Sequence, residues 1–95
     1  MTESEIQRDI TAYLKTAGFI VIRMNSGSVR HNVQMCEKGM PDLEVISPYG
    51  KVTFIEVKTE TGKVSDVQEQ MHARLRTYGQ EVIVARSVNN IRGIA

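Results

Sequence analysis

The stretch GMPDLEVISPYGKVTFIEVK, residues 39–58, decides the fold of this chain. It contains two largely apolar runs, 42–47 and 51–58, and both have the length and composition of β-strands. Between them lies Pro48-Tyr49-Gly50, and proline and glycine at this spacing are typical of a turn. The stretch therefore predicts a hairpin of two antiparallel strands.

The length of the turn determines which side chains meet. If the turn is three residues long, Ser47 lies opposite Lys51, and counting back along both strands places Asp42 opposite Glu56. Directly opposed side chains have Cβ atoms about 4.5–5.5 Å apart. Lys58 projects to the same face as Glu56, because side chains alternate along a strand. The prediction depends on register, since a shift of one residue moves the two acids to opposite faces.

Two neighbouring carboxylates repel each other in water, but together they can bind one divalent cation. Mg²⁺ usually takes one or two protein carboxylates and leaves its other positions to water and phosphate. Asp42 and Glu56 are the candidate ligands, with the carbonyl of Val57 as a third oxygen. Such a site would support hydrolysis of a phosphodiester, with Lys58 orienting the water or stabilising the transition state. These residue types are also common on solvated hairpins, so spacing alone leaves both interpretations open.

The rest of the chain supplies elements around this hairpin. Outside it we predict a helix at 4–17, a strand at 19–25, a helix at 65–78, a strand at 81–86 and a short helix from Val88. Residues 26–40 show neither period and predict a long loop, which is either functional or a connector. The order is α-β-β-β-α-β-α. A helix between the last two strands permits a parallel right-handed crossover, so we expect an α/β fold with a mixed sheet flanked by helices.

Both long helices begin with a capping-box pattern, Thr2 with Glu5 and Ser65 with Gln68. The strand at 19–25 begins with four apolar residues in a row, which predicts that it is covered on both faces. The apolar face of the second helix is predicted from its spacing to contain Val67, Met71, Leu75 and Tyr78.

Composition limits the class of protein. Ninety-five residues predict a single domain, 1–95, and its small core favours a homodimer. A net charge of +1 argues against a generic DNA coat, which needs many cations. The single cysteine excludes an internal disulfide. The chain has no apolar run of about 18 residues and a charged N-terminus, so we expect a cytoplasmic protein without a membrane segment.

Pro41-Asp42, followed by Glu56-Val57-Lys58, matches the PD-(D/E)XK motif of restriction-enzyme-like nucleases. The wider pattern is more specific, and with it the chain resembles the VRR-NUC family over nearly its whole length. The matching segments are 4–7, 23–25, 39–43, 56–58, the turn leading to Gln68, and 84–87. The family includes the nuclease domain of a eukaryotic DNA-repair enzyme and small stand-alone proteins of phages and bacteria. The resemblance implies a restriction-endonuclease-like PD-(D/E)XK core, Mg²⁺ or Mn²⁺ dependence and structure-selective cutting of DNA. A chain of this length resembles the phage type, encoded by a phage or prophage and acting in a bacterial host as a homodimer on four-way (Holliday) junctions.

The resemblance also implies roles for single residues. Asp42 and Glu56 match the metal ligands and Lys58 the catalytic lysine. Gln68 matches a helix glutamine that contacts the scissile phosphate or a metal-bound water, and Glu5 a first-helix acid at the metal site. A purely structural capping role stays open for both Gln68 and Glu5.

Several basic side chains are candidates for contacts with the DNA backbone, which position DNA without reading its sequence. They are Arg30, His31, Lys38 and Lys63. For His72, one turn beyond Gln68, we favour a solvated or packing role over the alternative that it borders the cleft. For Gly39 we expect a close backbone approach or a positive φ.

Three alternatives to a junction-cutting enzyme remain. The first is a flap or restriction-type endonuclease, and the second is a catalytically silent DNA-binding module with the same fold. The third is a structural dimerisation domain, which would not explain the polar cluster at the end of the hairpin.

Overall fold

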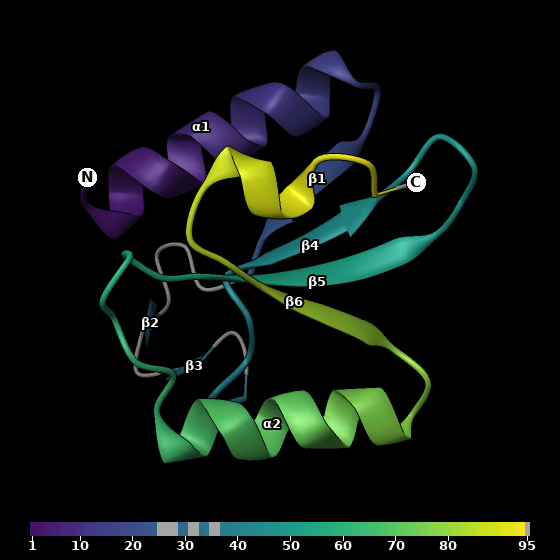
Figure 1. Cartoon of the computed structure of the whole chain (residues 1–95). Coiled ribbons are helices and arrows are strands. Elements are labelled where there is room, and N and C mark those ends of the chain that lie inside the picture. Colours follow the sequence, from purple (N-terminus) through teal and green to yellow (C-terminus); the bar gives the residue numbers. More distant parts are fainter. Residues whose placement is uncertain (25–28, 31–32, 35–36, 95) are drawn as a thin grey trace.

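A four-stranded mixed sheet forms the centre of the molecule (Figure 1). The computed structural model describes residues 1–24, 29–30, 33–34 and 37–94. In chain order the elements are α1 Glu3–Thr16, β1 Ile20–Arg23, β2 Val29–Arg30, β3 Val33–Gln34, β4 Leu43–Ile46, β5 Val52–Val57, α2 Asp66–Thr77, β6 Glu81–Ala85 and the 3₁₀ helix η1 Val88–Ile91. Helix α1 and η1 lie on one face of the sheet, and α2 lies on the other. The predicted α/β class is confirmed.

The strand order is β1-β4-β5-β6. Strands β1, β4 and β5 pair antiparallel, whereas β5 and β6 pair parallel through the crossover that contains α2. This confirms the predicted mixed sheet. Parallel neighbours need such a crossover, and the helix covers one face of the pair that it joins.

The register of the hairpin agrees with the three-residue turn. The Ser47 amide donates to the carbonyl of Lys51 at 2.9 Å, and the Gly50 amide donates to the carbonyl of Ser47 at 2.9 Å. Paired residues run from Ile46 with Val52 to Leu43 with Ile55. The next pair in this register is Asp42 with Glu56, as predicted.

The two faces of the sheet have different chemistry. On the α1 face, Leu43 and Val45 of β4 and Ile55 and Val57 of β5 are almost completely buried. They form the core with a set of aliphatic residues from α1, β6 and η1: Ile6, Ile10, Leu14, Ala85 and Ile91. The α2 face carries the alternate residues of the same strands and therefore contains the acids. The apolar core thus fixes the strands that carry the site.

Strand β1 is an edge strand, and the prediction that it is covered on both faces was wrong. Ile20 and Ile22 are 60% and 40% exposed. Helix α2 contacts β6, at the other edge of the sheet, so it does not cover this side of β1. Only the opposite side of β1 joins the core, where Val21 packs against the buried cluster.

Helix α2 is rotated relative to the predicted apolar face. Met71 and His72 are its buried residues, while Val67 and Tyr78 are 50% and 69% exposed. The prediction for Val67 and Tyr78 was therefore wrong. Gly39 explains part of the placement: its φ is +84°, and a Cβ there would lie 2.5 Å from the carbonyl oxygen of Val67. The first turn of α2 thus packs directly against the backbone of Gly39.

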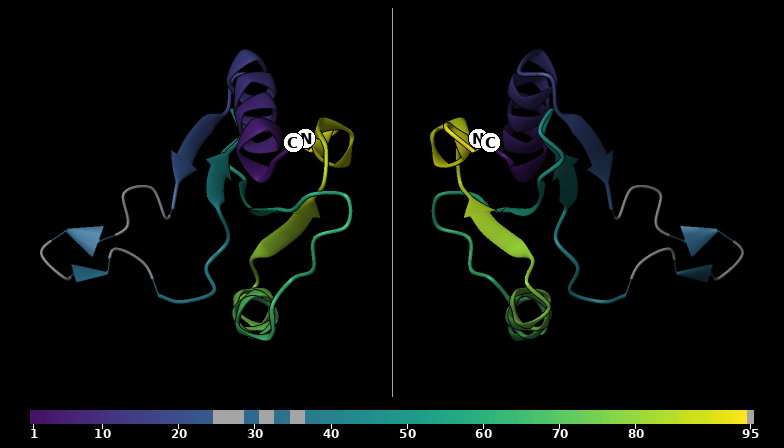
Figure 2. Two further views of the ribbon diagram at one scale, coloured as in Figure 1. Left: turned by 90° about the vertical axis from the view of Figure 1, so that its left-hand side faces the viewer. Right: turned by 90° about the vertical axis from the view of Figure 1, so that its right-hand side faces the viewer.

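Residues 26–40 were predicted to lack regular structure, but β2 and β3 form a small antiparallel pair within them. This pair stands apart from the main sheet (Figure 2). The predicted C-terminal helix is present as the short η1.

Candidate active site

Asp42 lies directly before β4, and the end of β5 holds its carboxylate. The backbone amide of Val57 donates to Oδ2 of Asp42 at 2.7 Å. Because the N–H and C=O of one strand residue point to the same side, the Val57 carbonyl also faces the Asp42 side of β5. The Asp42 carboxylate, one candidate ligand, is thus hydrogen-bonded to the residue whose carbonyl is another candidate.

Glu56 is buried in the middle of the sheet, and helix α2 contacts both of its carboxyl oxygens. Its exposed fraction is 1%. Nε2 of His72 lies 3.0 Å from Oε1, and Nε2 of Gln68 donates to Oε2 at 3.3 Å. His72 is itself 2% exposed. Helix α2 thus orients this carboxyl group by two side chains one helical turn apart.

The protonation of this cluster follows from its burial. Desolvation, hydrogen bonding to Asp42 and the charge of Asp42 raise the pKa of Glu56 to about 9, against a small opposing effect of Lys58. Burial, with the charges of Arg76 and Lys58, lowers the pKa of His72. At neutral pH in the absence of a cation, Glu56 is therefore protonated and His72 neutral. Their 3.0 Å contact is then a neutral hydrogen bond, not an ion pair.

Lys58 follows β5 and shares the face of Glu56. Its backbone amide donates to the carbonyl of Ala85 at 3.0 Å, so the strand pairing with β6 extends to this residue. The residue is 9% exposed, which is low for a lysine. A fixed backbone and little exposure hold the ammonium group at the end of the hairpin where the two acids meet.

The donor set fits a hard divalent cation. Across the described part of the chain, no three His, Cys, Asp or Glu side chains cluster closely enough to hold a metal by themselves. Two carboxylates and one carbonyl, with open positions left for water and phosphate, are the ligands that Mg²⁺ usually takes. The raised pKa of Glu56 agrees with this, because the carboxyl pair holds a proton where a cation would supply positive charge.

A model of the VRR-NUC domain family matches residues 3–89. The chain belongs to the VRR-NUC family. One similar protein is named "Putative nuclease p44", from Acyrthosiphon pisum secondary endosymbiont phage 1; it is 32% identical over 85 residues, which cover 90% of this chain and 83% of that protein. A solved structure described as "VRR_NUC domain" has a TM-score of 0.72 and 28% identity, and covers 94% of this chain and 89% of its own. The chain is thus a VRR-NUC nuclease domain.

In this VRR-NUC chain, Gln68 forms the predicted capping box and also contacts Glu56, while its predicted contact with a phosphate or metal-bound water stays a prediction. Its Oε1 accepts the Ser65 amide at 3.0 Å, and its backbone amide donates to the Ser65 hydroxyl at 3.2 Å. Its Nε2 is therefore free to reach Glu56. The capping box and the contact with the site use different atoms of one amide group.

Glu5 closes the capping box of α1 and is exposed. Its Oε1 accepts the Thr2 amide at 2.8 Å. Among the acids of α1, the exposed Glu3 contributes to the raised pKa of Glu56, and its contribution is the smallest after burial, Asp42 and Lys58.

Two residues near the site have roles that the sequence did not reveal. The first is His72, for which the sequence favours packing or solvent, and whose contact with Glu56 depends on the rotation of α2. The second is Arg86, whose Nη1 donates to the carbonyls of Thr59, Glu60 and Gly62 at 2.7, 3.3 and 2.6 Å. Arg86 therefore fixes the turn that follows Lys58.

The candidate DNA-contacting residues lie in different parts of the chain. Lys38 and Lys63 are exposed, in the turn before β4 and in the segment between β5 and α2. Arg30 lies in β2, but only its place in that strand is described, and His31 is outside the described residues. Among the helices described, none is long and apolar enough to cross a membrane.

Proposed function

We propose that this protein is a metal-dependent endonuclease that hydrolyses phosphodiester bonds in branched DNA. The observation that carries the proposal is the convergence of Asp42, Glu56 and Lys58 at one end of the hairpin, with Glu56 held by α2. A catalytically silent module would not need two adjacent carboxyl groups in a buried environment, because holding Glu56 protonated beside Asp42 destabilises the fold near neutral pH.

Each residue has a defined part in this proposal. Asp42, Glu56 and the carbonyl of Val57 would hold Mg²⁺ or Mn²⁺. When bound, such an ion supplies a Lewis acid for the phosphate and lowers the pKa of water. Lys58 places positive charge where the phosphate gains negative charge, and Gln68 and His72 keep the Glu56 carboxyl group in one orientation.

The proposed substrate is a four-way junction, cut by a homodimer. A twofold-symmetric dimer supplies two sites for two symmetric cuts. The exposed Ile20 and Ile22 on edge strand β1 support a self-complementary contact, since an edge strand with apolar side chains pairs readily with a second copy. Replacing Ile22 with Asp would then give a monomer by light scattering and single cuts where the parent makes paired ones.

The experiment is a cleavage assay on a synthetic four-way junction, a flap and plain duplex DNA, each with Mg²⁺, Mn²⁺ or EDTA. We expect junction cutting with either ion and none in EDTA. Lys58→Ala and Asp42→Asn should lower the rate by about 10²–10³-fold, as loss of a major transition-state interaction does. Lys51→Ala is the matched control, because Lys51 lies at the opposite end of the same strand and pairs with Glu81 at 3.1 Å. It should keep full activity.

The other outcomes identify the alternatives. Cutting that persists in EDTA or in Lys58→Ala would refute the metal-dependent mechanism. Cutting of flaps alone would identify a flap endonuclease, and cutting of duplex at one sequence a restriction-type enzyme. Binding of DNA without cutting in any metal would identify a silent module.

A further inference from the structure

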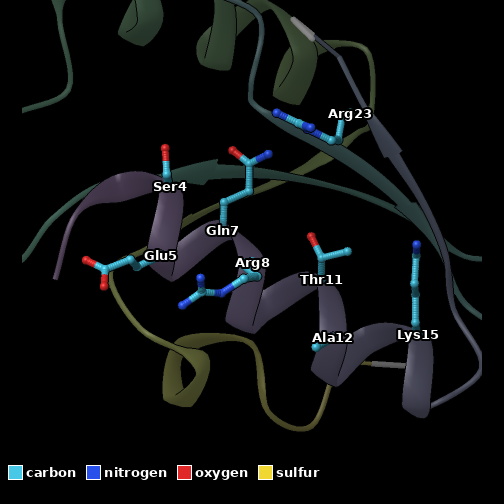
Figure 3. Close-up of a pocket in the computed structure, with 8 residues that line it drawn as sticks. All are labelled: Ser4, Glu5, Gln7, Arg8, Thr11, Ala12, Lys15 and Arg23. Carbon is cyan, nitrogen blue, oxygen red and sulfur yellow. The ribbon is translucent and has the colours of Figure 1, made fainter.

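A groove of about 640 Å³ lies between α1 and β1 (Figure 3). It opens on the face of the sheet opposite to Glu56 and α2, because Arg23, which lines it, pairs with the core residue Leu43. Three cationic side chains line the groove, Arg8, Lys15 and Arg23, against one acid, Glu5. The groove is therefore net positive in a chain whose total charge is only +1.

One side of α1 presents hydrogen-bonding groups to this groove. Ser4, Gln7, Thr11 and Lys15 are spaced by three or four residues and so lie along one stripe. Figure 3 shows these side chains projecting from the side of α1 on which Arg23 lies. The stripe is about 16 Å long at 1.5 Å per residue. That length matches four or five phosphates of one strand, at about 3.4 Å of axial rise each.

The cations of the groove are available for an external anion. Within the described residues, neither Lys15 nor Arg23 has an acidic partner within 4.0 Å. Arg8 has only a long, exposed contact, 3.9 Å from its Nε to Oδ1 of Asp9. The acid of the groove, Glu5, already accepts the Thr2 amide. Surface cations without acidic partners are free to bind phosphate.

One end of the groove lies at the end of the sheet that carries the active site. Arg23 is the last residue of β1, and the amide of the next residue, Met24, donates to the carbonyl of Asp42 at 2.9 Å. On α1, Ser4 follows Glu3, whose charge reaches Glu56. Lys15 marks the other end, near the end of the helix. The groove thus leads away from the catalytic carboxylates.

We infer that this α1–β1 groove binds the phosphate backbone of a DNA arm that extends from the cleaved bond. The inference rests on the proposed function, since it assigns a path to the proposed substrate. Hydroxyl, amide, lysine and arginine side chains are the groups that proteins use to contact phosphates. Such contacts position DNA without reading bases, as a structure-selective enzyme requires.

The test compares two double variants in the cleavage-inactive Lys58→Ala background, with binding to a labelled junction measured between 50 and 200 mM salt. Lys15→Ala with Arg23→Ala removes two of the three groove cations, the two without any acidic partner among the described residues. The control, Lys51→Ala with Arg74→Ala, also removes one lysine and one arginine charge. Both residues are exposed and lie outside the groove, where Lys51 pairs with Glu81 and Arg74 with Glu37. The groove variant should bind about ten-fold more weakly, with the salt slope reduced by about 2, because each B-DNA phosphate contact contributes about 0.9. The control variant should keep the parent affinity and slope.

Equal affinities and salt slopes for the two double variants would overturn the inference that the α1–β1 groove binds DNA. That failure differs from failure of the proposed function, because the unsubstituted protein would still cut junctions with Mg²⁺. If the unsubstituted protein neither binds nor cuts DNA, the proposed function fails and the groove loses its ligand. Restoring the binding with Lys15→Arg and Arg23→Lys would support charge, rather than local packing, as the cause.

Discussion

The two long helices begin with the same motif but relate differently to the active site. In α1, Thr2 and Glu5 form a capping box, with distances of 2.8 and 3.2 Å. In α2, Ser65 and Gln68 form the same box, with distances of 3.0 and 3.2 Å. Among the contacts of the described residues, only the second box reaches Glu56, because the Nε2 group of Gln68 donates to it.

The difference lies in chemistry as well as position. Both oxygens of a carboxylate only accept hydrogen bonds, so Glu5 has no donor to offer a second acid. An amide has an acceptor for the helix cap and two donors for a neighbour. A capping residue can therefore position an active site without loss of its cap, provided that it is an amide and that the helix starts beside the site.

The largest difference in cleavage is expected between variants that lose the third helical residue of each box, Gln68 in α2 and Glu5 in α1. Gln68→Ala should lower DNA cleavage by about 10–100-fold, the usual cost of removing a group that orients a metal ligand. Glu5→Ala should change it by less than about two-fold. Both variants lose one side of a capping box, and Gln68→Ala should lose more stability than Glu5→Ala because it also leaves the buried Oε2 of Glu56 without its donor. Cleavage rates and thermal melts of the two variants measure this, and equal losses of activity would remove the distinction between the helices.

One turn further along, the comparison extends to His72 and Asp9. His72→Ala should lower stability by about 2 kcal/mol, since it leaves a buried carboxyl oxygen without its partner, and cleavage by about ten-fold. Asp9→Ala removes a half-exposed side chain with one long ion contact and should change stability by less than about 0.5 kcal/mol. Denaturant unfolding together with the cleavage assay gives both numbers. A His72 variant with parent stability would show that its contact with Glu56 is dispensable.

The sequence predicted the two capping boxes and the hairpin register, because both depend on short-range spacing. Thr2 to Glu5 and Ser65 to Gln68 are local patterns, and the turn at 48–50 fixes which residues oppose each other. The pairing of Asp42 with Glu56 therefore follows from the spacing of residues along the hairpin alone.

The sequence did not predict the environment of Glu56, because tertiary packing determines it. A period of 3.6 residues does not say which face of α2 meets the sheet, so the apolar pattern points Val67 inward and misses His72. The prediction for the strand at 19–25 failed for the same reason: its apolar residues do not reveal that α2 lies over the opposite edge.

The third prediction concerns the pH dependence of stability and compares Glu56 with Glu5. Glu56 has a raised pKa of about 9, so the metal-free folded state holds a proton that the unfolded state releases above about 4.5. Stability should therefore fall as the pH rises from about 5 to 9. Glu5 has a pKa lowered by hydrogen bonds from the Thr2 backbone and side chain, so its contribution should be lost only as the pH falls below about 4.5.

The corresponding variants separate the two effects. In EDTA at pH 8, Glu56→Gln should raise the melting temperature by about 4–8 °C, equivalent to about 1 kcal/mol, and should flatten the profile above pH 5. Glu5→Gln should leave this range unchanged and act only at acidic pH. Melting curves across pH 3–9 test both signs. A stability of the parent that rises between pH 5 and 9 would contradict the assignment of a protonated Glu56.

The smallest effect is expected from the hydroxyl side of each box. Thr2→Ala and Ser65→Ala should each lower stability by about 1 kcal/mol, the usual cost of an N-cap residue, and the two melting temperatures should fall together. Their activities should nevertheless differ. Ser65→Ala frees the first turn of α2 and lets the Gln68 side chain leave its position, so cleavage should fall by about two- to five-fold, whereas Thr2→Ala should leave it unchanged. Ser65→Asp, which keeps a capping acceptor, should restore cleavage if the cap acts by positioning the helix start; if Ser65→Ala and Thr2→Ala cut equally well, the start of α2 does not position Glu56.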